Sequence, residues 1–116
     1  MTYEDDRTLT EALVEARAAG RACVLATIVS TRGSTPRKVG ARMLVDPETG
    51  LVGTVGGGCG EAEVIESAQR VLDSGRPERV RVDLTEDFTS WSPAVCGGVM
   101  DVFVERVTPD PPIADT

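Results

Sequence analysis

The stretch ACVLATIVST at residues 22–31 decides the fold of this 116-residue chain. Its residues are apolar on both faces of an extended chain, a pattern typical of a strand at the centre of a sheet. The stretch therefore predicts a central strand, and the segments around it predict what that strand packs against.

Two segments have the spacing of helices. Thr8 followed by Glu11 resembles a capping box, and apolar residues recur at helical spacing behind it. Because Gly20 supplies a stop, the first helix is predicted over residues 8–19. The second is predicted from residue 59 or 60 to residue 74. Strands are predicted at residues 41–46 and 51–55, which form a hairpin, and at residues 79–84 and 97–107.

This order of elements predicts an α/β fold, in which two main helices cover a mixed sheet of about five strands. A chain of 116 residues with 41% hydrophobic content is the right size for one core. We therefore expect a single domain over residues 1–116, with residues 109–116 as a frayed, proline-rich tail.

Composition excludes several classes of function. A net charge of -7 and only 3% aromatic residues disfavour nucleic acid as a partner. The sequence has no apolar run of a membrane span's length and no signal peptide at its acidic start, and its three cysteines are far apart. These features predict a cytoplasmic protein without a membrane partner. The absence of histidine excludes catalytic and metal sites built on imidazole in this chain alone.

A basic segment stands out in this acidic chain. Residues 16–45 contain no Asp or Glu but hold half of the twelve basic residues. Arg32, Arg37, Lys38 and Arg42 gather around one loop, which favours an anion site over a merely solvated face. Ser34 and Thr35, in the same loop, are suited either to donate to a phosphate or to form a local turn with the following proline.

A second candidate is the glycine loop TVGGGCGE, which leads from a strand into a helix. Backbone amides and the helix dipole favour an anion there, although the loop matches neither a Walker motif nor a dinucleotide fingerprint. Its glycines are Gly56, Gly57 and Gly58. Cys59 follows at the first turn of the helix, where a thiolate is favoured, although Cys59 taken alone is better explained as a small apolar residue that closes the turn. Glu61 is a dipole partner or, less simply, a general base.

The remaining cysteines differ in their settings. Cys96 precedes two glycines, so close backbone approach to a ligand is possible there, at Gly97 in particular. Cys23 lies within the apolar central strand and is predicted to be core. Cys59 and Cys96 are thus the two candidate thiol ligands for a soft metal.

Three segments together resemble the amino-terminal domain of the XdhC/CoxI family of accessory proteins for molybdenum hydroxylases. They are STRGSTPRKVGARMLV at residues 30–45, LVGTVGGGCGEAEVI at residues 51–65 and CGGVMDVFVE at residues 96–105. The resemblance implies a protein that binds the molybdenum cofactor, as molybdopterin or its dinucleotide form. It also implies help in sulfuration by a cysteine desulfurase and delivery to an apo-enzyme such as xanthine dehydrogenase or carbon monoxide dehydrogenase.

The resemblance and the residue chemistry are compatible. The basic loop suits the pterin or phosphate, the glycine-loop amides suit the phosphate, and a thiolate of Cys59 or Cys96 suits molybdenum or sulfur handling. Many members of the family carry a second, Rossmann-like domain. We expect any role of that domain to come from a separate subunit or to be absent, and we expect this chain to work as a homo-oligomer or with a separate partner domain. The alternatives are a thiol-dependent enzyme using Cys59 with Glu61 and a scaffolding subunit without catalysis.

Overall fold

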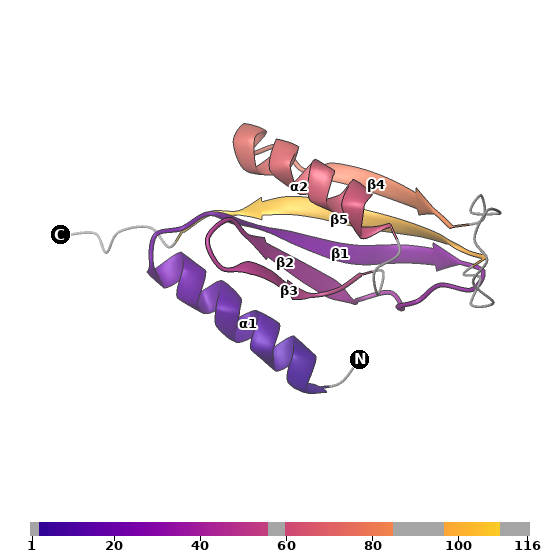
Figure 1. The fold of residues 1–116 in the computed structure, drawn as a ribbon, viewed down its shortest axis with the longest axis horizontal. Helices are drawn as coiled ribbons and strands as arrows, with labels where there is room; N and C mark the ends of the chain where they lie inside the picture. The colour runs from indigo at the N-terminus through magenta and orange to yellow at the C-terminus, as the bar shows by residue number, and fades with distance from the viewer. Residues whose placement is uncertain (1–2, 56–59, 85–96, 110–116) are drawn as a thin grey trace.

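The computed structural model describes residues 3–55, 60–84 and 97–109 of the chain, arranged as two helices and five strands (Figure 1). None of the described helices is long and apolar enough to cross a membrane. In chain order the elements are α1 Tyr3–Ala18, β1 Cys23–Arg32, β2 Arg42–Asp46, β3 Gly50–Gly53, α2 Glu61–Ser74, β4 Glu78–Asp83 and β5 Val99–Val107.

The strands form one sheet in the order β3-β2-β1-β5-β4, so the predicted central strand lies at its centre. Along β1, residues of even number from Val24 to Ile28 face one side of the sheet, whereas Cys23 and Leu25 face the other. Both sides of β1 carry apolar residues because a helix packs on each side of the sheet. The prediction of an α/β domain with five strands and two helices is confirmed.

The pairing of the strands differs from a mixed sheet. Each of the four described pairings is antiparallel. Strands β3 and β4, which α2 connects, run in the same direction, but they lie at opposite edges with three strands between them. A helical crossover therefore joins two parallel strands that never become neighbours, and the expectation of a mixed sheet is corrected to an antiparallel one.

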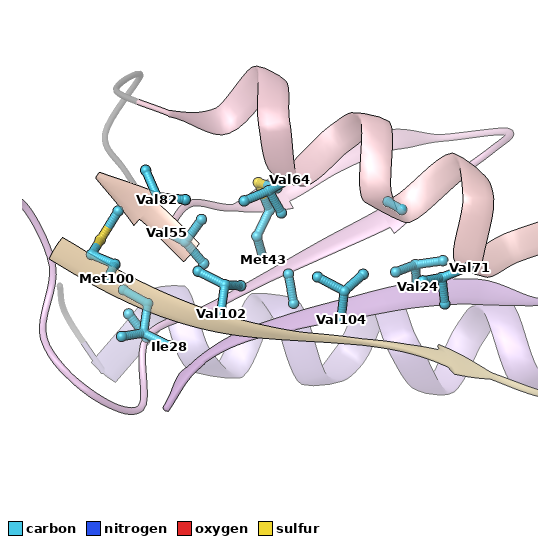
Figure 2. Close-up of a cluster of buried hydrophobic side chains, with 13 residues drawn as sticks. Val24, Ile28, Met43, Val55, Val64, Val71, Val82, Met100, Val102 and Val104 are labelled. Atoms are coloured by element: carbon cyan, nitrogen blue, oxygen red, sulfur yellow. The ribbon is translucent and has the colours of Figure 1, made fainter. Parts of the chain in front are cut away.

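The larger core lies between α2 and the sheet (Figure 2). Helix α2 presents Val64, Ala68 and Val71 to it, three residues at helical spacing. Valine and methionine fill most of the space on the strands, because the sheet has few aromatic residues to contribute. The strand residues labelled in Figure 2 are Val24, Ile28, Met43, Val82, Met100, Val102 and Val104.

Helix α1 covers only part of the opposite side of the sheet. Its residues Leu9 and Ala16 pack with Leu44 of β2 and with Cys23 in the smaller core, over β2 and β3 (Figure 1). The helix begins at Tyr3, ahead of the predicted start at Thr8, so it includes the acidic residues that precede the capping-box pattern. Alongside α1, over β5 and β4, no described helix packs on this side of the sheet.

A partly buried ion-pair cluster, in which only the Asp46 side chain is fully enclosed, fastens the segment after α1 to the β2–β3 hairpin. Arg21 Nη2 lies 3.1 Å from Asp46 Oδ2, and Arg21 Nε lies 3.0 Å from Glu48 Oε2. Burial disfavours the ionised Asp46, but the guanidinium and the amide of Glu48 outweigh it and lower the pKa of Asp46 to about 2. The carboxylate thereby holds the hairpin turn as well as the helix end.

Candidate functional site

One end of the sheet gathers the ends of several elements (Figure 1). Strand β1 ends at Arg32, β4 ends at Asp83 and β5 begins at Val99, and these three residues lie in one cross-strand row. The N-terminus of α2 lies nearby, because Gly60 packs against Val82 of β4. Three segments that are distant in sequence therefore approach the same end of the sheet. They are residues 33–38, residues 97–98, and the glycine loop, of which residues 54–55 and 60–61 are described.

Two glycines bring the β1–β2 loop against the start of β5. A Cβ at Gly98 would lie 2.5 Å from the carbonyl oxygen of Ser34 and 2.6 Å from that of Arg32, so a side chain does not fit. From the loop side, a Cβ at Gly33 would lie 3.0 Å from the Gly97 carbonyl oxygen, and the φ of Gly33 is 72°, which favours glycine. The two segments thus make one tight backbone contact, and the Ser34 side chain remains exposed.

The far end of the same loop is held to β1 by backbone hydrogen bonds. The Gly40 amide donates to the Ile28 carbonyl at 2.9 Å, and the Ile28 amide donates to the Ala41 carbonyl at 3.0 Å. Between the two anchors, Thr35 Oγ1 donates to the Arg37 carbonyl at 2.9 Å. Of the two roles open to Thr35, the structure thus contains the local turn.

The predicted basic cluster is divided between two places. Arg37, which is half-buried, and Lys38, which is exposed, lie on the β1–β2 loop. The Arg32 side chain is exposed at the end of β1. Arg42 lies on β2, and its Nη2 donates to Thr10 Oγ1 of α1 at 3.4 Å. The loop itself therefore presents two of the four cations, and the α1 side of the sheet takes Arg42.

The residues that flank the glycine loop are well packed. Val55 is fully buried in the larger core. Gly60, the N-cap of α2, has a φ of 74°, and a Cβ on it would overlap Val82 Cγ1. Thr54 Oγ1 donates to Glu61 Oε2, which joins the two ends of the loop. Within the described residues, Gly60 provides no side-chain cap for the first amides of α2, which are the groups that favour negative charge at a helix start.

Several predicted site residues lie outside the described residues, namely Gly56, Gly57, Gly58, Cys59 and Cys96. Gly97, beside the last of these, is exposed, and a Cβ on it would meet nothing within 4 Å. An approaching ligand can therefore reach the Gly97 backbone. In the described part of the chain, no three His, Cys, Asp or Glu side chains lie together as a metal site requires.

Cys23 is buried, as predicted. Burial raises the pKa of its thiol, and the nearby Asp46 carboxylate acts in the same direction, whereas Arg21 and Arg17 oppose them. A neutral, enclosed thiol of this kind is a packing residue.

Sequence reasoning gave no role to Gly33 or Thr54, and it did not find the contact that Gly98 makes at this end of the sheet. Gly33 and Gly98 provide the tight contact between the loop and β5, and Thr54 bonds to Glu61. The signal available for the glycines was their place beside a strand end, where close backbone approach is a common reason for glycine. Nothing in the sequence indicated that they face one another.

Comparison with known proteins identifies the domain. Residues 16–83 match the model of the XdhC and CoxI family. The chain belongs to this family. It is 32% identical over 112 residues to the "Molybdenum cofactor insertion chaperone PaoD" of Escherichia coli, covering 95% of this chain and 34% of that protein. It is 36% identical over 103 residues to a probable xanthine dehydrogenase subunit of Bacillus subtilis, covering 87% of this chain and 30% of that protein.

A solved structure of similar sequence has the same fold. The crystal structure of a xanthine dehydrogenase from Bacillus halodurans superposes with a TM-score of 0.72 at 36% sequence identity, covering 88% of this chain and 30% of that one. The chain thus spans about a third of the length of these relatives. The family likeness runs from β1 through the β2–β3 hairpin and α2 to the end of β4, and it includes two of the three segments that meet at the site.

Proposed function

We propose that this domain binds the molybdenum cofactor at the loop end of the sheet and assists its insertion into a hydroxylase of the xanthine dehydrogenase type. The observation that carries the proposal is the meeting of the β1–β2 loop with the start of β5 through Gly33 and Gly98. The name of the E. coli relative as an insertion chaperone supports the same role for this family member.

The described residues suit an anionic, phosphate-bearing ligand. Arg37 and Lys38 would attract its negative charge, and Ser34 is exposed on the same loop to donate a hydrogen bond. The open backbone at Gly97 and the uncapped start of α2 would supply amide donors. When bound, the cofactor supplies a thiophilic molybdenum held by a dithiolene. Arg32 and Thr35 complete the proposed set of cofactor-binding residues. Thr35 acts by stabilising the loop, through its hydrogen bond to the Arg37 carbonyl.

Cys59 and Cys96 are proposed to contact the cofactor, whereas Glu61 is proposed to stabilise the loop around it. Cys59 and Cys96 are the proposed soft ligands, and Gly56, Gly57 and Gly58 would let the backbone approach the phosphate closely. The hydrogen bond from Thr54 favours a supporting role for Glu61, because a carboxylate engaged in closing the loop is a poor general base. A cofactor-handling role therefore accounts for more of the site than a thiol-dependent enzyme does.

The finer parts of the proposal concern partners. Sulfuration of the cofactor by a cysteine desulfurase, service to a carbon monoxide dehydrogenase, action in the cytoplasm and cooperation with a separate Rossmann-like subunit are proposed on the family resemblance. The apo-hydroxylase is the proposed recipient of the cofactor. Two of the named relatives, the insertion chaperone and the probable dehydrogenase component, are consistent with a hydroxylase partner.

The test is to isolate the chain from a host that makes the cofactor and to measure bound pterin by fluorescence and bound molybdenum by elemental analysis. An Arg37→Ala, Lys38→Ala double variant should lose both, and its deficit relative to the unaltered chain should be largest at low salt, because salt screens the charges that the variant lacks. Arg76→Ala, which removes an exposed cation from the α2–β4 connection, is the matched control. Equal cofactor content in all three proteins would contradict the proposed site.

The thiol part of the proposal has its own test. A thiol reagent applied to the native protein should modify Cys59 before Cys23, because Cys23 is fully buried and its thiol pKa is raised. Cys59→Ser should remain folded but retain less molybdenum. If Cys59 reacts no faster than Cys23 and the serine variant keeps its molybdenum, the loop is a structural turn.

A further inference from the structure

The side of the sheet that α1 occupies is only half covered. Helix α1 packs over β2 and β3 and over the start of β1 and the end of β5, at Cys23 and Val107, and no described helix packs over the rest of β1 and β5 or over β4 on this side. This open half spans three strands about 4.8 Å apart, which is close to the width of a single helix of about 10 Å. The cross-strand pairing assigns it six central residues, Thr27, Ser30, Arg79, Arg81, Asp101 and Phe103, and the bulge residue Val29 lies beside Ser30 in the chain.

The open half combines apolar and basic groups. Val29, at a bulge of β1, is 43% exposed, and Phe103 lies between Thr27 and Arg79 in one cross-strand row. In the next row, Asp101 accepts a hydrogen bond from Ser30 at 2.7 Å. The same Asp101 has Arg79 Nη2 at 3.9 Å.

Positive charge exceeds negative charge at the centre of this half. The hydrogen bond from Ser30 is the largest cause that lowers the pKa of Asp101. Desolvation raises this pKa, and the positive charges of Arg79, Arg81 and Arg32 lower it further. Three guanidinium groups thus act on one carboxylate, and Arg79 is the one within 4 Å of it. The other carboxylates of the half, Glu105 and Asp83, lie toward its two ends by register, so the centre remains basic in a chain whose net charge is -7.

The outer side of α1 has the opposite character. The inner side of the helix packs against its own sheet through Leu9 and Ala16. The residues directly opposite them on the helix are exposed and combine acidic with small apolar groups. They are Glu11, Val14, Glu15 and Ala18, and Val14 is 59% exposed.

We propose that a second copy of this chain covers the open half, with α1 of each copy seated on the open half of the other. Because α1 and the open half lie side by side in one layer, a two-fold axis between them would place the two α1 helices next to each other between two facing sheets. The outer side of each α1 then meets the partner's sheet. Glu11 and Glu15 would approach Arg79 and Arg81, and Val14 would approach Val29 or Phe103.

The size of this contact is adequate for a weak, closed dimer. A 16-residue helix is about 24 Å long and about 10 Å wide, so each footprint is roughly 240 Å². The dimer has two such contacts, and each contact buries surface on both copies, so the total buried area is roughly 1,000 Å². This is near the lower limit for specific interfaces. The contact is isologous and closes on itself, so it predicts dimers and no larger assemblies.

Light scattering and sedimentation of the full chain test the proposal. At low salt the mass should rise with concentration from 12.3 kDa to twice that value, and high salt should favour the monomer. The Arg79→Glu, Arg81→Glu variant and the Glu11→Arg, Glu15→Arg variant should each dimerise roughly tenfold or more weakly, because like charges then face one another. Arg76→Glu, at an exposed position outside the interface, is the control and should dimerise like the unaltered chain.

Mixing the two double variants is the decisive step. In a mixed dimer, both contacts regain opposite charges, since the unaltered helix of one copy meets the unaltered sheet of the other and the two reversed surfaces meet each other. The mixture should therefore dimerise as the unaltered protein does. A chain that is monomeric throughout, a dimer that ignores both reversals, or a mixture that stays monomeric would each overturn the proposal. Circular dichroism of every variant establishes that it is folded.

Discussion

Replacing Gly98 with alanine tests whether the close contact between the β1–β2 loop and β5 holds the site together. The new Cβ would lie 2.5 Å and 2.6 Å from two backbone carbonyl oxygens, those of Ser34 and Arg32. Ordinary contacts of this kind begin at 3.4 Å, so the loop or the start of β5 must move by about 1 Å. Neither obstacle is the flexible end of a side chain. We expect a cost of about 1–3 kcal/mol, the range for overpacking a well-packed region.

The neighbouring Gly97 gives a matched control. A Cβ at Gly97 would meet nothing within 4 Å, so Gly97→Ala should change the free energy of unfolding by less than about 0.5 kcal/mol. Thermal and urea unfolding, followed by circular dichroism, measure both variants, and Gly98→Ala should lower Tm by about 5 °C or more. Pterin content should fall in Gly98→Ala as the loop carrying Arg37 shifts. Equal stability of the two alanine variants would refute the reasoning about the contact.

Three further perturbations test other parts of the structure. Gly60→Ala should destabilise by about 2 kcal/mol, more than Gly20→Ala, because both have positive φ but only Gly60 has a side chain in the way; urea unfolding compares them. The folded pKa of Asp46 is lowered from 3.8 to about 2, so its stabilisation of about 2 kcal/mol is complete above about pH 5 and is lost progressively as the pH falls through about 2. Asp46→Asn should flatten that part of the stability profile. Ser67→Ala should cost about 1 kcal/mol in thermal unfolding, since buried Ser67 Oγ donates to Glu78 Oε1 at 2.8 Å.

The elements of the fold were readable from the sequence because each has a local cause. The stretch at residues 22–31 is apolar on both sides, and it became the central strand β1. Helix α2 ends at Ser74 as predicted, with Gly75 in the left-handed conformation that closes helices. The strand order was not readable, because the position of β4 beside β5 depends on contacts between segments far apart in the chain.

The candidate site was readable only in part, for the same reason. The composition of the β1–β2 loop singled out Arg37 and Lys38, and both lie on that loop in the structure. The contact between Gly33 and Gly98 is a long-range packing event between segments about 65 residues apart, and neither segment records its partner. Arg42 was grouped with the loop because it is close in sequence, but the start of β2 turns it toward α1.

Arg32 connects the two surfaces proposed here and shows why they are separable. Its carbonyl oxygen lies against Gly98, so its backbone belongs to the contact that positions the loop. Its side chain is exposed and contributes to the positive charge around Asp101, on the α1 side of the sheet. Most substitutions at Arg32 leave its backbone contact with Gly98 in place, whereas any neutral residue at this position removes the side-chain charge. Loss of the Arg32 charge should therefore act first on the open half, and Arg37 and Lys38 remain the charges that belong to the loop alone.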